Sequence, residues 1–191
     1  DTIATLFETG VEPYFKGTWI YDKWTEPTYP VFRLSFLNLD NFSIDEFKSE
    51  LNSKITDFAN KISVKGYVEK SEPENSIEGL LERLREEKRQ IVFLIDEYDY
   101  QLTSNINNDD LYKQFQHKIK RFYANIKNKW AIKFLGITGV TRLKDVEIFS
   151  IGSDIRDITN ASAYSQMIGF TRDEIKKYYI DYLTLAASYE N

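Results

Sequence analysis

The sequence predicts an α/β fold built around a mainly parallel sheet, on the basis of two observations. Continuous apolar runs such as residues 91–95 (IVFLI) suit strands that are buried on both faces. Amphipathic segments separate these runs, and helices that alternate with strands are typical of βαβ units. The 191 residues are enough for one such domain with a substantial core.

The first part of the chain predicts a short helix, a strand and a long helix. Residues 1–8 have the pattern of the end of a helix, which Gly10 closes. Residues 30–36 (PVFRLSF) predict a strand. Ser43 and Glu46 form a capping box, which predicts the start of the next helix. The apolar face of that helix consists of Ile44, Phe47, Leu51, Ile55, Phe58 and Ile62.

The middle of the chain predicts two helices on either side of the 91–95 strand. Residues 75–78 cap the first, and the Asn-rich residues 104–110 predict a loop before the second. The inward side chains of the first helix are Ile77, Leu80, Leu81 and Leu84. Those of the second are Leu111, Phe115, Ile119, Phe122 and Ile126.

The last part of the chain predicts two strands and a final helix. Residues 131–138 form the longer strand, and residues 157–159 (DIT) are interpreted as a short one. A second capping box at residues 171–174 opens a helix. We predict a core domain at residues 1–168, and at residues 169–191 a terminal helix that begins a lid.

Composition excludes several classes of function. The net charge of −5 does not favour nucleic-acid binding. The chain has no Cys, so we expect a reducing, cytoplasmic location. His117 is the only histidine, which excludes a multi-His metal site. We interpret His117 and the basic helix face around it (Lys113, Lys120 and Lys127) as solvated surface, although this face is also a candidate nucleic-acid contact. No apolar run is long enough to span a bilayer.

Three acids follow the 91–95 strand, and they are the main candidate site. Asp96, Glu97 and Asp99 lie where the carboxyl end of a parallel strand is expected to meet a ligand. An apolar strand that ends in Asp-Glu has the form of a Walker B element. Asp96 would then hold Mg²⁺, and Glu97 would align the attacking water. The alternative is that the acids only cap the next helix.

Other polar residues are expected at the same edge of the sheet. Thr138 ends the next strand and is a candidate sensor residue, or else simply opens the turn at Gly139. Arg142 is a candidate phosphate contact, with a solvated loop residue as the alternative. Ser35 and Asn38, which follow the early strand, are candidates for orienting Glu97.

A phosphate-binding loop is absent from the sequence. Such a loop has the form G-x-x-x-x-G-K-[ST], and none of the eight glycines is followed by Lys and then Ser or Thr. The 191 residues therefore contain no backbone cradle for a β-phosphate.

Several motifs together resemble the AAA-ATPase-like domain, a P-loop NTPase family that often precedes a PD-(D/E)XK nuclease domain. They are YPV (29–31), IVFLIDEYD (91–99), FLGITGV (134–140), IFS with DIT (148–150 and 157–159) and GFTRDE (169–174). The DTIATLFE of residues 1–8 resembles the end of the helix that follows Walker A in this family. The sequence departs from the family where Tyr100 and Gln101 follow DEYD in place of Lys-Pro, and where residues 152–156 replace an Asn-rich turn.

The resemblance implies a three-layer αβα sandwich, with ATP and Mg²⁺ as cofactors. In this family Asp96 would bind the metal, and Glu97 and Thr138 would be catalytic. The nucleotide contact of Arg142 is expected only from its place on the loop after Thr138, not from the resemblance. We expect a segment before Asp1 to supply Walker A and its strand, so that the fold is incomplete at its amino terminus and inactive alone. Without that strand, the strand of Asp96 and its neighbours are expected to lack a partner.

Three functions remain open from the sequence. The first is a Mg²⁺-dependent ATPase whose site is completed outside this chain. The second is a degenerate P-loop fold that binds a protein partner without catalysis. The third, ranked last, is a phosphohydrolase in which Asp96, Glu97 and Asp99 bind metal directly. An appended nuclease domain or another protein partner fits the first two.

Overall fold

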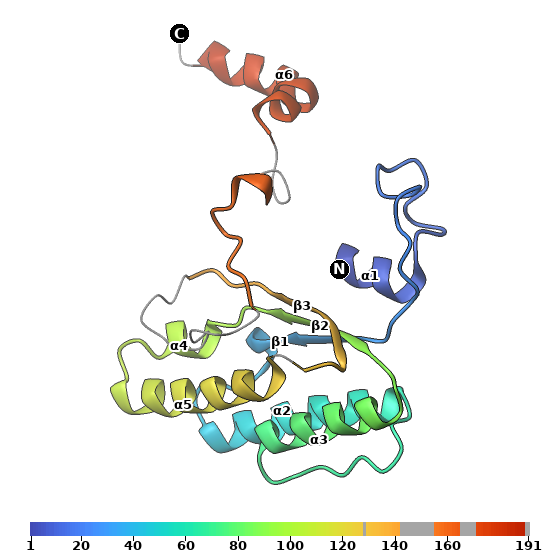
Figure 1. The fold of residues 1–191 in the computed structure, drawn as a ribbon. Helices are drawn as coiled ribbons and strands as arrows, with labels where there is room; N and C mark the ends of the chain where they lie inside the picture. Colours follow the sequence, from blue (N-terminus) through green and yellow to red (C-terminus); the bar gives the residue numbers. More distant parts are fainter. Residues whose placement is uncertain (128, 142–154, 165–170, 190–191) are drawn as a thin grey trace. The chain divides into compact units, whose positions relative to one another are not determined.

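The computed structural model describes residues 1–127, 129–141, 155–164 and 171–189. Figure 1 shows how their helices and strands are arranged. The chain divides into two compact units, Asp1–Ile155 and Arg156–Asn191, which are taken separately below. The predicted domain boundary at residues 168 and 169 lies outside the described residues.

A three-stranded parallel sheet forms the centre of the first unit. Its strands are β1 (Val31–Ser35), β2 (Ile91–Asp96) and β3 (Ile132–Ile137), and they lie in that order across the sheet. All three end at one edge, where Ser35 lies beside Asp96 in the register. The predicted parallel α/β fold is therefore confirmed.

The expectation that the strand of Asp96 would lack a neighbour is wrong. β2 is the central strand and is hydrogen-bonded to β1 on one side and to β3 on the other. In the described part of the chain, the strand edges without a partner are the outer edges of β1 and β3. β2 is thus paired along both edges. The acidic residues at its carboxyl end are therefore attached to a strand that both neighbours hold in place.

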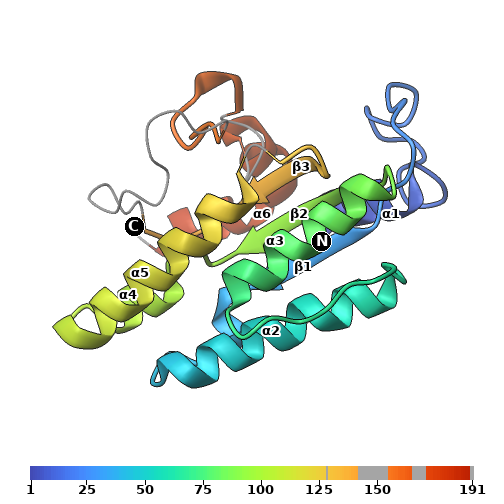
Figure 2. The same cartoon turned by 60° about the horizontal axis from the view of Figure 1, so that its bottom comes forward.

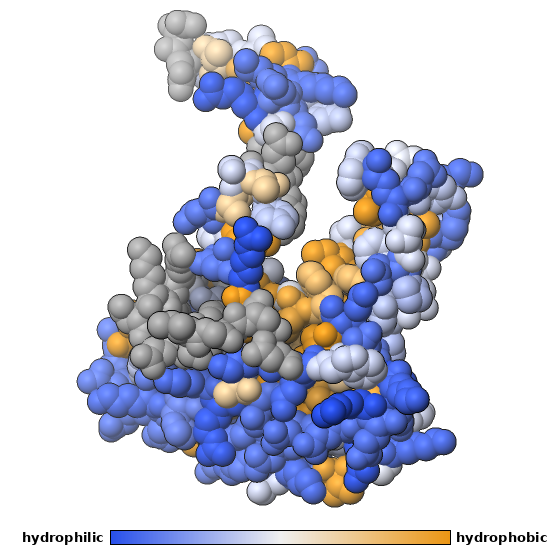
Figure 3. All heavy atoms as spheres, in the orientation of Figure 1, coloured by the Kyte–Doolittle hydropathy of each residue, from blue (hydrophilic) through white to orange (hydrophobic). Residues whose placement is uncertain are grey.

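Three helices cover one face of the sheet, as Figure 2 shows. They are α2 (Ile44–Lys61), α3 (Pro73–Glu86) and α5 (Asp109–Ile126), close to the ranges that the apolar periodicity predicts. Beneath them the ring of Phe93 stacks on Phe32 with centroids 4.7 Å apart, and both side chains are buried. The outward faces of these helices are mostly hydrophilic (Figure 3), so their apolar stripes pack onto the sheet.

A short helix, α1 (Thr2–Thr9), covers part of the opposite face. Alternate residues of a strand point to opposite faces, so Val31 and Val92 turn away from the large core. These two valines form a second, smaller core with Ala4 and Phe7 of α1. Phe7 also stacks on Phe134 of β3 at 5.4 Å. Helices on both faces are consistent with an αβα sandwich.

The structure differs from the sequence analysis at two places. A short helix that was not predicted, α4 (Tyr100–Ser104), includes the first residue of the predicted loop at residues 104–110, and α5 includes its last two. Residues 157–159, interpreted as a strand, form a turn in which the amide of Thr159 donates to Asp157 Oδ1 at 2.9 Å. An Asp side chain offers the backbone this local hydrogen bond in place of strand pairing, which explains the difference.

The second unit contains a 3-10 turn, η3 (Ser162–Tyr164), and the helix α6 (Arg172–Tyr189). The predicted capping box is present: Thr171 Oγ1 accepts from the amide of Glu174 at 3.2 Å, and Glu174 Oε2 accepts from the amide of Thr171 at 2.8 Å. Tyr179 has non-helical torsion angles inside α6. The lid role of this helix stays a prediction.

Candidate functional site

The carboxyl edge of the sheet gathers acids and hydroxyls from all three strands. Ser35 ends β1, Asp96 ends β2, and Thr138 directly follows β3. They meet because parallel strands all end at the same edge. The structure therefore brings together residues that lie about 60 and 40 positions apart in the sequence.

Asp96 and Thr138 are in direct contact. Thr138 Oγ1 donates a hydrogen bond to Asp96 Oδ1, and the amide of Glu97 donates to the same oxygen at 3.0 Å. The backbone holds this pair in place, because the amide of Thr138 donates to the carbonyl of Ile95 at 2.9 Å and the amide of Tyr98 donates to the carbonyl of Thr138 at 3.1 Å. Backbone pairing thus continues one residue beyond the end of β3 and two residues beyond the end of β2.

Glu97 has an unusual backbone conformation, with φ of 55°. Among the residues that the structure describes, two other non-glycine residues share it, Ser63 and Lys88. Both directly follow the capping residue at the end of a helix, where left-handed residues are common. Glu97 follows a strand, where a non-glycine residue in this region costs about 1–3 kcal/mol. Its carboxylate accepts a hydrogen bond from Ser35 Oγ at 3.1 Å. The strained backbone of Glu97 therefore occurs at the residue whose side chain is bonded to Ser35 of the neighbouring strand β1.

Ser35, rather than Asn38, is the residue that meets Glu97. Asn38 is exposed in η1 (Phe36–Asn38), the 3-10 turn that follows β1. Of the two candidates for orienting Glu97, the structure thus favours Ser35.

Asp99 is separated from the other two acids by its burial and its contacts. Its residue surface is 2% exposed, and its carboxyl oxygens accept from the amides of Val140 at 3.3 Å and Thr141 at 2.6 Å. A site in which Asp96, Glu97 and Asp99 bind metal directly would need these oxygens free. The described residues also contain no cluster of three or more His, Cys, Asp or Glu side chains suited to a metal.

Two buried amides fasten α4 to the loop that follows β1. Gln101 Nε2 donates to the carbonyls of Phe36 at 2.8 Å and Leu39 at 3.1 Å. Asn105 Nδ2 donates to the carbonyl of Asn41 at 2.8 Å. Sequence reasoning missed both residues, although Gln101 stands out there as a departure from the family pattern.

The side chains at this edge fit a magnesium ion in their chemistry. Asp96 is exposed and supplies a carboxylate, and Ser35 and Thr138 add hydroxyl oxygens nearby. Mg²⁺ prefers oxygen ligands and is commonly held by one or two carboxylates plus water and phosphate. Arg142, the predicted phosphate contact, lies outside the described residues.

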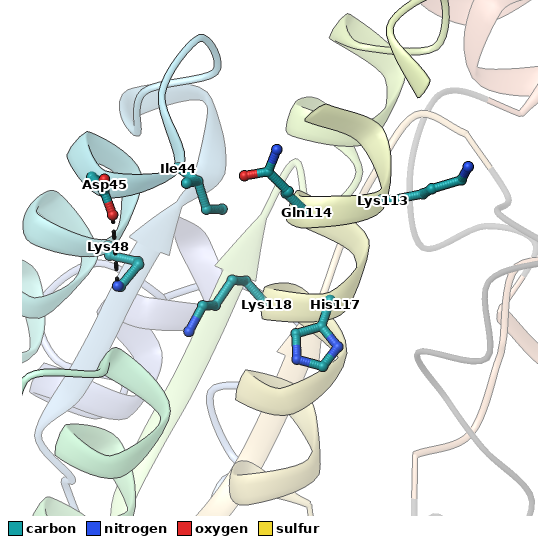
Figure 4. A pocket seen from close by; sticks show the side chains of 7 residues that line it. All are labelled: Ile44, Asp45, Lys48, Lys113, Gln114, His117 and Lys118. Carbon is teal, nitrogen blue, oxygen red and sulfur yellow. Dashed lines mark ion pairs between the residues drawn. The ribbon is translucent and has the colours of Figure 1, made fainter. Parts of the chain in front are cut away.

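The basic face of α5 borders a different feature, an open pocket of about 360 Å³ between α2 and α5. In Figure 4 the side chain of Lys113 points away from α2, whereas that of Lys118 extends from α5 toward Lys48 of α2. Lys118 forms an ion pair with Glu72, as does Lys48 at 2.9 Å. These two ammonium groups, Lys118 first, lower the pKa of Glu72. Paired charges of this kind support a structural role for the pocket.

A buried acid strengthens that interpretation. Glu74 is 1% exposed, and its Oε1 lies 3.0 Å from Arg121 Nε and 3.3 Å from Lys118 Nζ. A buried carboxylate needs such partners. Lys118 and Arg121 of α5 therefore pair with an acid of α3, and neither belongs to the basic face of Lys113, Lys120 and Lys127.

Comparison with known proteins identifies the family. A family model described as a predicted AAA-ATPase (AAA-ATPase-like) matches residues 1–149. A curated relative, an uncharacterized protein in the vnfD 5′ region of Azotobacter chroococcum mcd 1, is 27% identical over 180 residues. The match covers 92% of this chain but 34% of the relative, so the chain spans about a third of that protein. No solved structure matches the chain significantly. The family model covers well over half of the sequence, and the chain belongs to the AAA-ATPase-like family.

Proposed function

We propose that the carboxyl edge of this sheet is the water- and metal-handling half of an ATP site. The observation that carries the proposal is the group of contacts at that edge, where Thr138 meets Asp96 and Ser35 meets Glu97. Membership of a family described as predicted AAA-ATPases supports nucleotide binding and ATPase activity in general. Because the 191 residues contain no phosphate loop, we propose that a loop outside them completes the site.

Each side chain has a role in this proposal. Asp96 is proposed to hold the metal, and the bound Mg²⁺ would neutralise the charge of the phosphates. Thr138, which is bonded to Asp96, is proposed as the sensor residue. Glu97 accepts a proton from the attacking water or aligns it, which requires a carboxylate fixed within hydrogen-bond reach. Ser35 provides that fixation through its bond to Glu97. Arg142 is proposed to contact the phosphates because it lies four residues after Thr138.

Replacement of Glu97 by glutamine in the full-length protein tests the proposal. Glutamine keeps the size and the hydrogen bond with Ser35 but cannot take a proton, so ATP turnover should fall by a factor of about 10²–10⁴ while ATP still binds. Glu82→Gln is the matched control, since Glu82 is exposed on α3. Hydrolysis at the wild-type rate in Glu97→Gln would refute the assignment.

The second candidate is a non-catalytic fold that binds a protein. The absence of a phosphate loop from the 191 residues favours it. It predicts that the full-length protein neither binds nor is thermally stabilised by ATP with Mg²⁺, whereas an ATPase is stabilised by its ligand. An appended nuclease domain, implied by the resemblance, is compatible with either candidate. None of the helices in the described ranges is long and apolar enough to cross a membrane.

A further inference from the structure

The residues after β2 hold the loop after β3. Beyond Thr138 that loop leaves the regular ladder, and the amides of Val140 and Thr141 would lose their strand partners. The carboxyl group of Asp99 replaces those partners, with Oδ1 accepting from Val140 at 3.3 Å and Oδ2 from Thr141 at 2.6 Å. One side chain thus binds both amides that directly follow Gly139.

Tyr98 makes a second attachment to the same loop. Its hydroxyl donates to the carbonyl of Thr141 at 3.0 Å, and its amide donates to the carbonyl of Thr138 at 3.1 Å. Consecutive residues of the β2 segment therefore bind both ends of the stretch from Thr138 to Thr141. Four hydrogen bonds in so short a stretch leave it little freedom.

The glycine at position 139 shows how close the two segments lie. A Cβ added to Gly139 would lie 2.4 Å from Cδ1 and Cε1 of Tyr98 and 2.7 Å from Asp99 Oδ1. Real Cβ atoms essentially never approach so closely. The loop after β3 is thus in direct van der Waals contact with both residues that hold it.

The surroundings of Asp99 favour a fixed position. Asp99 is 2% exposed, and the nearby phenol of Tyr123 is fully buried. Burial, and then the charges of Tyr98 and Asp99, raise the pKa of Tyr123 well above its usual value. A buried carboxyl group is costly unless its donors stay in place, so movement of the loop away from Asp99 is unfavourable.

We propose that Asp99 is a positioning residue, which holds the loop after β3 so that Thr138 stays against Asp96. The proposal rests on the function proposed above and adds a residue that does not touch the reacting atoms. The third acid of the DEYD motif then acts through Thr138. It connects the two strands whose ends form the proposed site.

Hydrogen exchange of the full-length protein tests the structural half of this proposal. In Asp99→Asn, the new side-chain NH₂ group faces one of the two backbone N–H donors and cannot accept its hydrogen bond. Hydrogen exchange at the amides of Val140 and Thr141 should therefore accelerate about 10- to 100-fold. Tyr98→Phe, a milder variant that removes one hydroxyl, should accelerate exchange in the same loop to a lesser degree. Asn52→Ala is the matched control, because Asn52 is a buried polar residue that binds the Lys70 carbonyl in a different region. Unchanged protection in both test variants would overturn the proposal.

Kinetics test the functional half. Asp99→Asn should lower kcat for ATP about 100-fold, as expected when a reacting group is misplaced, with little change in KM. In a Thr138→Ala background the same substitution should lower kcat by less than about twofold, because the residue through which it acts is gone. Asn52→Ala should leave kcat unchanged. Independent, multiplicative effects of Asp99→Asn and Thr138→Ala would show that Asp99 does not act through Thr138.

The two arms separate this proposal from the proposed function. Accelerated exchange together with non-additive kinetics supports both. If the wild-type protein binds and hydrolyses no ATP, the proposed function fails, and hydrogen exchange alone decides whether Asp99 holds the loop. If the wild-type protein hydrolyses ATP and Asp99→Asn does so at the same rate, the role of Asp99 is refuted while the ATPase assignment stands.

Discussion

Replacement of Gly139 by alanine should destabilise the protein, although glycine-to-alanine changes often stabilise proteins. The added Cβ would lie 2.4 Å from two ring carbons of Tyr98, against an ordinary contact distance of at least 3.4 Å. Either the ring or the loop must therefore move by roughly 1 Å. The hydrogen bonds of Tyr98 and Asp99 to Thr141 oppose that movement.

Overpacking of this kind costs about 1–3 kcal/mol in the free energy of unfolding. The matched variant is Gly79→Ala, because a Cβ at Gly79 meets nothing within 4 Å and the residue lies inside α3. There alanine should stabilise the protein by about 0.5–1 kcal/mol through its better helix propensity. The two variants make the same chemical change with opposite expected signs.

Urea unfolding of the wild type and both variants measures the difference. We expect the midpoint of Gly139→Ala to fall and that of Gly79→Ala to rise, with little change in the slope m. If Gly139→Ala is as stable as the wild type, the close contact between the loop after β3 and Tyr98 does not exist. The reasoning for Asp99 would then lose its geometric basis.

Three further changes test other parts of the structure. Phe93→Ala should lower the free energy of unfolding by about 3–5 kcal/mol in urea, because Phe93 is fully buried at the centre of the core. Glu72→Gln should be less stable than the wild type at pH 7, because Lys118 and Lys48 lower the pKa of Glu72 below its usual 4.5. That difference in unfolding midpoint should close as the pH falls through the lowered pKa, where the wild-type carboxylate takes up its proton. Ser35→Ala should lower kcat about tenfold at constant KM, because Glu97 loses the hydrogen bond that fixes it.

Matched controls accompany these changes. Phe134→Ala removes a ring that is 40% exposed and should cost less than Phe93→Ala. Glu82→Gln, on exposed surface, should show no gap that depends on pH. Ser53→Ala, on the exposed side of α2, should leave kcat unchanged. If the stability lost in Glu72→Gln does not depend on pH, this contradicts the ion pairs of Glu72 with Lys118 and Lys48. If kcat is unaltered in Ser35→Ala, this contradicts the hydrogen bond by which Ser35 fixes Glu97.

The sequence predicted the main elements closely where burial dictates the pattern. The uniformly apolar run at residues 91–95 can only be buried on both faces, and β2 occupies it. The 18-residue helices α2 and α5 carry enough turns for their apolar stripes to be recognised. The five-residue helix α4 is too short to show a period, and tertiary hydrogen bonds of Gln101 and Asn105 fix it.

The candidate site was predictable only in part, for a similar reason. The rule that parallel strands end at one edge was enough to bring Asp96 and Thr138 together. The partners of Asp99 are backbone amides 41 and 42 residues away in sequence. Backbone groups are present at every position, so no pattern of side chains indicates which of them a buried acid will meet. The acid was visible in the sequence, but its separation from Asp96 and Glu97 required the structure.

The end of β2 is held from both sides, and this explains how Glu97 keeps a strained conformation. On the β1 side Ser35 binds Glu97, and Gln101 binds the loop that follows β1. On the β3 side Thr138 binds Asp96, and Asp99 binds the amides beyond it. A left-handed non-glycine residue persists only where its surroundings over-determine it. Since the two sets of bonds belong to different strands, loss of either should release Glu97 only partly, whereas loss of both should let its turn relax and displace the carboxylate on which the proposed hydrolysis depends.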